Sequence, residues 1–300
     1  MKHAALARLG LLALIWGSAF LWIKLAIRGF SPVEVTLGRL ALGSAVLFPV
    51  VAARHEALPR LGRVWAHIVV AALFANALPY LLFALAEQSI SSSTAGIINA
   101  TTPLWTMVLA LAVRHQKTIG PWQAAGLIVG FAGTLLIFSP WQSASDIASA
   151  GGLECLAASA SYAVSYIYMD RYLVRRGISP IVLSACQLAA AAVMLALVLP
   201  FAGATVPRPS LASVTGLAVL GVIGTGAAYV LNYQIISSEG ATIASTVTYL
   251  LPVIAIVLGV LILGETITIL VLAGIALVLV GVALTRRKRQ PERAAEPRSA

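Results

Sequence analysis

The two halves of this chain carry the same marker residues in the same order. Tyr80 and Pro103 recur 149 positions later as Tyr229 and Pro252. Further markers recur at a shift of 148, where Gly29, Ser31, Pro32, Gly126 and Gly133 correspond to Gly177, Ser179, Pro180, Gly274 and Gly281. Collinear matches at nearly one offset indicate an internal duplication, so both halves should adopt the same fold.

The composition places both copies in a membrane. The chain is 60% hydrophobic and only 10% charged, whereas about 25% of the residues of a soluble domain are charged. Its apolar stretches reach the roughly 20 residues that a helix needs to cross the hydrocarbon core. Because lipid offers no partners for backbone polar groups, and no alternating strand pattern is present, we predict an all-α integral membrane protein.

We predict ten transmembrane helices, five in each copy. The spans are expected at 7–27, 33–53, 65–86, 92–113, 120–138, 151–169, 180–200, 212–235, 241–263 and 267–285. An odd number of spans per copy requires the second copy to enter the membrane in the opposite orientation, so the two five-helix units form an inverted repeat.

The same pattern divides the chain into four parts. Residues 1–138 form the first repeat, 139–150 a linker, 151–285 the second repeat and 286–300 a basic tail. The tail is charged and contains proline, so we expect it to be disordered. Its basic cluster either contacts anionic lipid or serves only as a stop signal.

The distribution of basic residues predicts the orientation. Nearly all of the 20 lysines and arginines fall in the tail, near the N-terminus, or in the connections of one side. Only Arg28 and Arg208 fall in connections of the other side, while Lys24 and Arg39 fall within spans. Basic residues mark the cytoplasmic side, so we expect both termini in the cytoplasm of a bacterial-type inner membrane.

Three motifs carry a family resemblance. They are Trp16-Gly17-Ser18-Ala19-Phe20, then Arg39 after Pro32, then Leu263-Gly264-Glu265 followed by Gly274 and Gly281. Together they resemble the EamA type of the drug/metabolite transporter superfamily, and within it the YddG-type exporters of aromatic amino acids. The resemblance covers residues 7–285 and implies a ten-helix carrier of small metabolites.

The chain departs from the family pattern at one position. The repeat offset places a partner for Glu265 at position 116, where the family often has a glutamate, but this chain has Gln116. A role for a carboxylate at that end of the first half is therefore not carried over. Arg39 aligns with Gln187, so the copies also differ at a polar position within the membrane.

Matched prolines predict two helix breaks. Pro103 and Pro252 lie near the middle of spans four and nine. A proline inside a helix frees the carbonyl four residues earlier, here those of Asn99 and Thr248. Paired breaks in repeat-related helices point to a binding site at the membrane midplane, although prolines can also serve packing alone.

Aromatic and amide side chains surround these breaks. Most of the tyrosines are too deep in the spans for an interfacial belt, and a buried phenol needs a hydrogen-bond partner. Two alternatives follow, an aqueous aromatic-lined cavity or a dry polar packing seam, and we favour the cavity. Its candidate substrate-binding residues are Asn76, Tyr80, Asn99, Trp105, Tyr162, Tyr166, Tyr229, Asn232, Tyr233 and Tyr249.

The charges narrow the class of solute. None of the ten acidic residues falls near the midplane, so a lipophilic cation or a carboxylate proton relay has no anchor there. Lys24 and Arg39 are the possible charge partners. Arg39 either faces a solute carboxylate, pairs with Glu34 or extends outward. A neutral or zwitterionic solute with an aromatic or apolar side chain fits best.

These patterns predict a secondary transporter that exports aromatic and other neutral amino acids by alternating access. The alternative is an exporter of nucleosides, sugar conjugates or amphipathic drugs. An enzyme is not indicated, because the sequence has no nucleophile–base pair, metal-ligand spacing or Walker loop. We expect a monomeric chain whose partners are the lipid bilayer and a small solute, with no cofactor, metal or nucleic acid.

Overall fold

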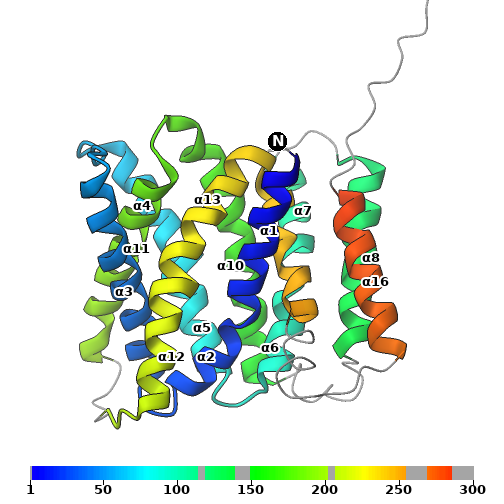
Figure 1. The fold of residues 1–300 in the computed structure, drawn as a ribbon, viewed down its shortest axis with the longest axis horizontal. Coiled ribbons are helices and arrows are strands. Elements are labelled where there is room, and N and C mark those ends of the chain that lie inside the picture. The colour runs from blue at the N-terminus through cyan, green and yellow to red at the C-terminus, as the bar shows by residue number, and fades with distance from the viewer. Residues whose placement is uncertain (1, 114–118, 139–148, 202–206, 255–268, 286–300) are drawn as a thin grey trace, which may run out of the picture.

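The computed structural model describes residues 2–113, 119–138, 149–201, 207–254 and 269–285. All regular elements in these ranges are helices, and they run between two ends of the molecule (Figure 1). Glu265, the tail 286–300 and most of the predicted linker 139–150 lie outside the described residues.

Ten membrane-spanning segments are present, several of them divided into consecutive helices. The first half contains α1 (Lys2–Gly17), α2 (Ala19–Ala26), α3 (Pro32–Ala53), α4 (Arg63–Ala72), η1 (Leu73–Ala77), α5 (Leu78–Ala86), α6 (Ser92–Asn99), α7 (Thr102–Ala112) and α8 (Pro121–Phe138). The second half contains α10 (Ala150–Tyr172), η3 (Val174–Arg176), α11 (Pro180–Val198), η4 (Leu199–Phe201), α12 (Leu211–Gly221), η5 (Val222–Ala227), α13 (Ala228–Glu239), α14 (Ala241–Ser245) and α16 (Ile269–Thr285).

Length and hydropathy agree with this assignment. Six described segments are long and apolar enough to cross a membrane, and three shorter apolar helices accompany them. The remaining span is α10, whose 23 residues are about 35 Å long. It is less apolar because it carries Ser159, Ser161 and Ser165, which are buried against neighbouring helices. The protein is therefore the predicted all-α membrane protein with ten transmembrane helices.

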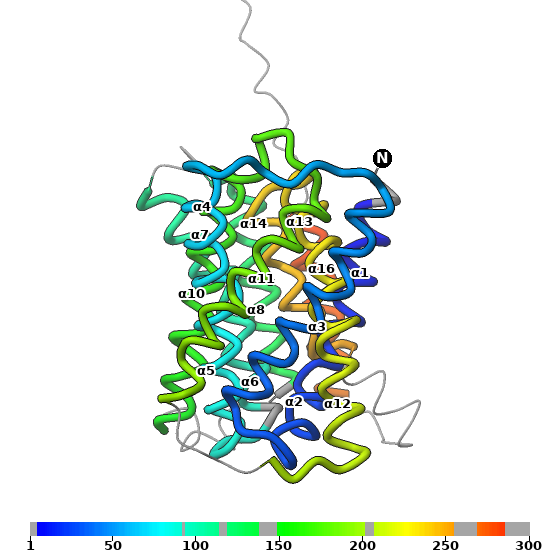
Figure 2. Tube along the Cα trace, turned by 90° about the vertical axis from the view of Figure 1, so that its left-hand side faces the viewer, coloured from blue at the N-terminus to red at the C-terminus, as the bar shows by residue number. Residues whose placement is uncertain are grey.

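The second half is inserted the opposite way round to the first. Ser31 caps the start of α3 and its repeat mate Ser179 caps the start of α11, each followed by a proline in the first turn. The Ser179 hydroxyl also donates to Glu56, which follows the C-terminal end of α3. Because α3 and α11 pack along each other, these equivalent helices are antiparallel. Figure 2 shows residues 54–62 crossing that same end of the bundle.

Helices of the two halves pack in alternation and do not form two separate bundles. α3 packs against α11 and α8 against α16, while α2 contacts α12 and α5 contacts α10. Figure 1 shows α8 and α16 as an adjacent pair at one side of the molecule. The core is therefore shared, and neither half buries its apolar faces alone.

Glycines bring α8 and α16 into close contact. A Cβ atom on Gly126 would lie 2.6 Å from the carbonyl oxygen of Gly281, and one on Gly133 would lie 2.7 Å from that of Gly274. Such distances leave no room for a side chain. The glycine spacing thus allows the two backbones to approach, which is how helices in lipid gain van der Waals contact.

Spans three and eight each contain a π-helical segment at the repeat-equivalent position. These segments, η1 and η5, begin 149 residues apart, at Leu73 and Val222. A π-helical turn disturbs the i→i−4 hydrogen-bond ladder and is frequent at functional sites. Carbonyls of both segments accept side-chain hydrogen bonds from the opposite half, from Trp16 Nε1 to Gly224 (3.0 Å), from Tyr229 Oη to Ala75 (2.5 Å) and from Ser161 Oγ to Phe74 (2.8 Å).

The two proline-associated spans are interrupted in different ways. Span four breaks between α6 and α7, directly before Pro103, which lies in the first turn of α7. Span nine is interrupted at Thr246, ahead of the Thr248 position that Pro252 predicts. The hydroxyls of Thr246 and Thr248 bond to carbonyls three residues earlier, and such back-bonding bends helices. The hydroxyl bonds of these two threonines therefore explain where span nine is interrupted.

Candidate functional site

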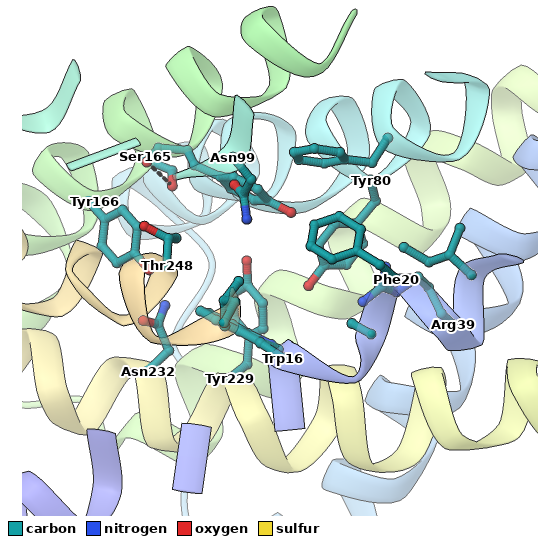
Figure 3. Close-up of a pocket in the computed structure, with 15 residues that line it drawn as sticks. Trp16, Phe20, Arg39, Tyr80, Asn99, Ser165, Tyr166, Tyr229, Asn232 and Thr248 are labelled. Carbon is teal, nitrogen blue, oxygen red and sulfur yellow. Dashed lines mark hydrogen bonds between the residues drawn. The ribbon is translucent and has the colours of Figure 1, made fainter. Parts of the chain in front are cut away.

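A cavity lies at the centre of the bundle, between elements of both halves. The space between its lining atoms amounts to about 650 Å³, with the open solvent at its mouth included. Its lining is mainly aromatic with few polar groups. The predicted residues that line it are Tyr80, Asn99, Tyr162, Tyr166, Tyr229 and Asn232, together with Arg39 (Figure 3).

Four predicted substrate-binding residues do not line the cavity. Asn76 accepts from Gln187 Nε2 at 2.6 Å, and the Tyr233 hydroxyl donates to Gln187 Oε1. The Tyr249 hydroxyl donates to the carbonyl of Leu127 at 2.9 Å. Trp105 is half-buried elsewhere on α7. Three of these four residues therefore belong to buried polar contacts between helices, so the molecule contains both alternatives considered above, a cavity and polar seams.

The two prolines and Lys24 also lie outside the cavity lining. Lys24 Nζ donates to the carbonyl of Glu87 at 2.7 Å and to that of Ile90 at 3.4 Å. These carbonyls follow the C-terminal end of α5, where a cation is favourable. Lys24 thus ties span one to the end of span three and does not face the cavity.

Arg39 faces the cavity. Its side chain is 4% exposed, and its guanidinium carbon lies 3.7 Å from the centre of the Tyr80 ring. Its Nε donates to Thr225 Oγ1 at 3.1 Å. The carboxylate of Glu34 instead accepts from the Ser31 amide at 2.7 Å in a capping box. The alternatives of pairing with Glu34 or extending outward are therefore not realised.

The Arg39 contact has a counterpart in the other half. Gln187, the repeat mate of Arg39, donates to Asn76 of η1, whereas Arg39 donates to Thr225 of η5. Asn76 and Thr225 are themselves 149 residues apart. Equivalent positions thus make equivalent contacts across the two halves, but only the first-half copy carries a charge. The inverted repeat therefore encloses an asymmetric site.

The cavity carries a net positive charge. Among its described lining residues, Arg39 is the charged one and the others are neutral side chains. Arginine stays protonated in proteins. A buried charge without a counterion is unfavourable by several kcal/mol, on the order of the values known for buried ion pairs that lose one partner. An anionic group bound in the cavity would supply the missing counterion for Arg39.

Two asparagine side chains provide polar groups away from Arg39. Asn99 Oδ1 accepts from Thr102 Oγ1 at 3.3 Å, and Figure 3 shows its amide nitrogen directed toward the middle of the cavity. Asn232 is 2% exposed, and its Oδ1 has no hydrogen-bond partner within the described part of the chain. Asn99 thus supplies an amide donor to the cavity, and the unsatisfied acceptor of Asn232 is buried at its wall.

Several lining residues were not among the sequence candidates. Phe20 and Phe83 pack edge to face with ring centres 5.7 Å apart, and Trp16 contacts the Tyr229 ring in the same way at 6.2 Å. Ser165 and Thr248 add hydroxyls to the lining. Trp16 and Phe20 belong to the first-span motif, which was the one sequence signal that could have included them.

Two inverted units of five transmembrane helices around a central cavity are an architecture of membrane transporters. The family model of the EamA-like transporter family matches residues 6–139 and again residues 150–287. The chain belongs to the EamA-like transporter family.

Similar proteins occur in bacteria and archaea. The chain is 25% identical to the uncharacterized transporter YdfC of Bacillus subtilis over 276 aligned residues. The aligned region covers 91% of this chain and 88% of YdfC. The chain is 26% identical to an uncharacterized transporter of Archaeoglobus fulgidus, over 94% and 98% of the two chains. It is 25% identical to the uncharacterized inner membrane transporter YedA of Escherichia coli, over 86% and 82%.

A solved crystal structure shares the fold. It superposes with a TM-score of 0.74, covering 94% of this chain and 96% of the other, at 20% sequence identity. The likeness extends over nearly the whole described bundle, so the arrangement of helices is that of a known protein fold.

Proposed function

We propose that this transporter exports amino acids, aromatic and other neutral ones, across a bacterial-type inner membrane by alternating access. The observation that carries the proposal is Arg39 in an aromatic-lined cavity. Its guanidinium suits a solute carboxylate, and the surrounding rings suit an aromatic or apolar side chain. Aromatic ring faces and amide oxygens can receive the ammonium group.

The packing between the two halves limits which parts of the protein can move as rigid bodies. Since spans of both halves alternate in the bundle, the two sequence halves cannot rock as independent bodies. We infer that each moving body combines spans from both halves. The natural pivots are the π-helical segments η1 and η5 and the breaks in spans four and nine, because departures from regular helix are where helices bend.

A panel of solutes tests this function. Purified protein in liposomes should exchange labelled tryptophan or phenylalanine several-fold faster than protein-free vesicles, and faster than it exchanges nucleosides, sugar conjugates or lipophilic cations. Failure to move any amino acid would remove this substrate class. No acidic side chain is present among the described lining residues, so we expect movement down the solute gradient. Concentrative uptake on acidifying one side would contradict that expectation.

Cysteine labelling tests the orientation. Ala57, which follows the C-terminal end of α3, and Arg175, which precedes α11, are exposed near the contact between Ser179 and Glu56. Arg208 is exposed at the opposite end, where its amide donates to the carbonyl of Gly29 ahead of α3. The native Cys155 and Cys186 are buried. In a background without native cysteines, we expect Ala57→Cys and Arg175→Cys to react from the cytoplasm and Arg208→Cys from outside. Labelling of 57 and 175 from different faces would overturn the inverted fold, whereas a complete reversal would overturn only the orientation.

A further inference from the structure

We propose that the cavity binds the two ends of its solute at separate subsites, a carboxylate at Arg39 and a hydrogen-bond donor at Asn232. The preferred solutes are then aromatic carboxylates with a polar group on the far side of the ring, such as hydroxyphenyl and indole compounds. The inference rests on the proposed function and specifies which solutes that function favours.

The Arg39 subsite is built for a planar anion. One face of the guanidinium lies on the Tyr80 ring and its Nε is used by Thr225. These contacts hold the group in one orientation and leave the terminal nitrogens for a carboxylate. A guanidinium fixed in this way can donate two parallel hydrogen bonds to one carboxylate, which a flexible ammonium cannot do.

The Asn232 subsite requires a donor from the solute. Its Oδ1 is buried and unpaired among the described residues, and the residue lines the cavity. A buried acceptor without a partner is unfavourable, so a hydroxyl or N–H group that reaches it gains the full benefit of the bond. The Asn99 amide nitrogen adds a donor to the same cavity.

The two subsites lie on opposite sides of the cavity. Figure 3 shows the Trp16 and Tyr229 rings between Arg39 and Asn232. The carboxylate and ammonium of an amino acid are attached to one carbon atom, so both cannot be divided between these ends. With the carboxylate at Arg39, the aromatic ring lies along Trp16 and Tyr229 and its distal group points toward Asn232.

Tyrosine and phenylalanine differ only by the distal hydroxyl, so their transport ratio tests the proposal. In proteoliposomes we expect the wild-type protein to favour tyrosine over phenylalanine about tenfold in kcat/KM, which corresponds to one neutral hydrogen bond that the smaller solute cannot make. Asn232→Leu should bring this ratio close to one while phenylalanine transport stays within about twofold. Ser237→Ala, which changes an exposed side chain outside the cavity lining, should leave the ratio unchanged.

Two results would overturn the inference. One is a wild-type ratio near one, which needs no variant and so does not depend on folding of Asn232→Leu. The other is a variant that loses both solutes equally. The pair 4-hydroxyphenylpropionate and 3-phenylpropionate separates this inference from the proposed function. If these carboxylates show the preference and no amino acid is moved, the amino-acid function fails and the two-subsite cavity stands.

Discussion

Replacing Arg39 with glutamine should reduce amino-acid transport by about a hundredfold. A hydrogen bond to a charged group contributes about 1.5–3 kcal/mol, and loss of a bidentate contact of about 3 kcal/mol corresponds to roughly a hundredfold weaker interaction. Arg39 is the charged side chain among the described residues of the cavity lining, so no neighbour there replaces it. The measurement is the initial rate of labelled tryptophan uptake into proteoliposomes, normalised to folded protein.

A conservative variant of Arg39 separates charge from geometry, and a variant of Lys24 provides the control. Arg39→Lys keeps the charge but loses the planar fork and the stacking on Tyr80, so we expect an intermediate loss of about tenfold. Lys24→Gln removes the other intramembrane cation, which bonds backbone carbonyls away from the cavity. Its transport per folded molecule should stay within about twofold of wild type. Wild-type rates for Arg39→Gln would exclude a solute carboxylate at this residue.

Replacing Gly281 with leucine should prevent normal packing of α8 and α16. A Cβ atom at this position would lie 2.4 Å from the amide nitrogen of Gly130 and 2.7 Å from the carbonyl oxygen of Gly126. Both are backbone atoms, so the helices themselves must separate. Overpacking typically destabilises by about 1–3 kcal/mol, and we expect a clash with backbone atoms to reach the upper end of that range. The check is the fraction of monodisperse protein after detergent extraction, together with its thermal unfolding midpoint.

Gly10 offers the matched control for this variant. It also lies within a helix, α1, but a Cβ atom there meets nothing within 4 Å. Gly10→Leu should therefore leave the yield and unfolding midpoint near the wild-type values, since helix propensity even improves when glycine is replaced. Equal behaviour of the two leucine variants would show that contact between α8 and α16 contributes little to stability.

The membrane class, the duplication and the inversion could all be predicted from the sequence. Hydropathy is a local property, because each span meets lipid along its own length. The marker residues repeat in order, and an odd number of spans per copy leaves inversion as the consequence. Depth within the membrane also identified most of the polar residues that line the cavity, because Tyr80, Tyr162 and Tyr229 lie too deep for the membrane–water interface.

The π-helical segments could not be predicted. The sequence of η1, Leu73-Phe74-Ala75-Asn76-Ala77, contains residues compatible with an ordinary α-helix. Whether its carbonyls turn outward depends on donors that arrive from other spans, namely Ser161 and Tyr229.

The sequence by itself determined that this chain is a ten-span inverted duplication, because burial in lipid and repetition of markers are properties of the chain alone. Only the tertiary structure decided which polar side chains face the cavity. Tyr229 and Tyr233 lie one turn apart on the same span, yet Tyr229 lines the cavity and Tyr233 bonds to Gln187. Likewise, the position of Arg39 is set by Thr225, 186 residues away. Such choices depend on which helices become neighbours, and that is settled only when all spans pack together.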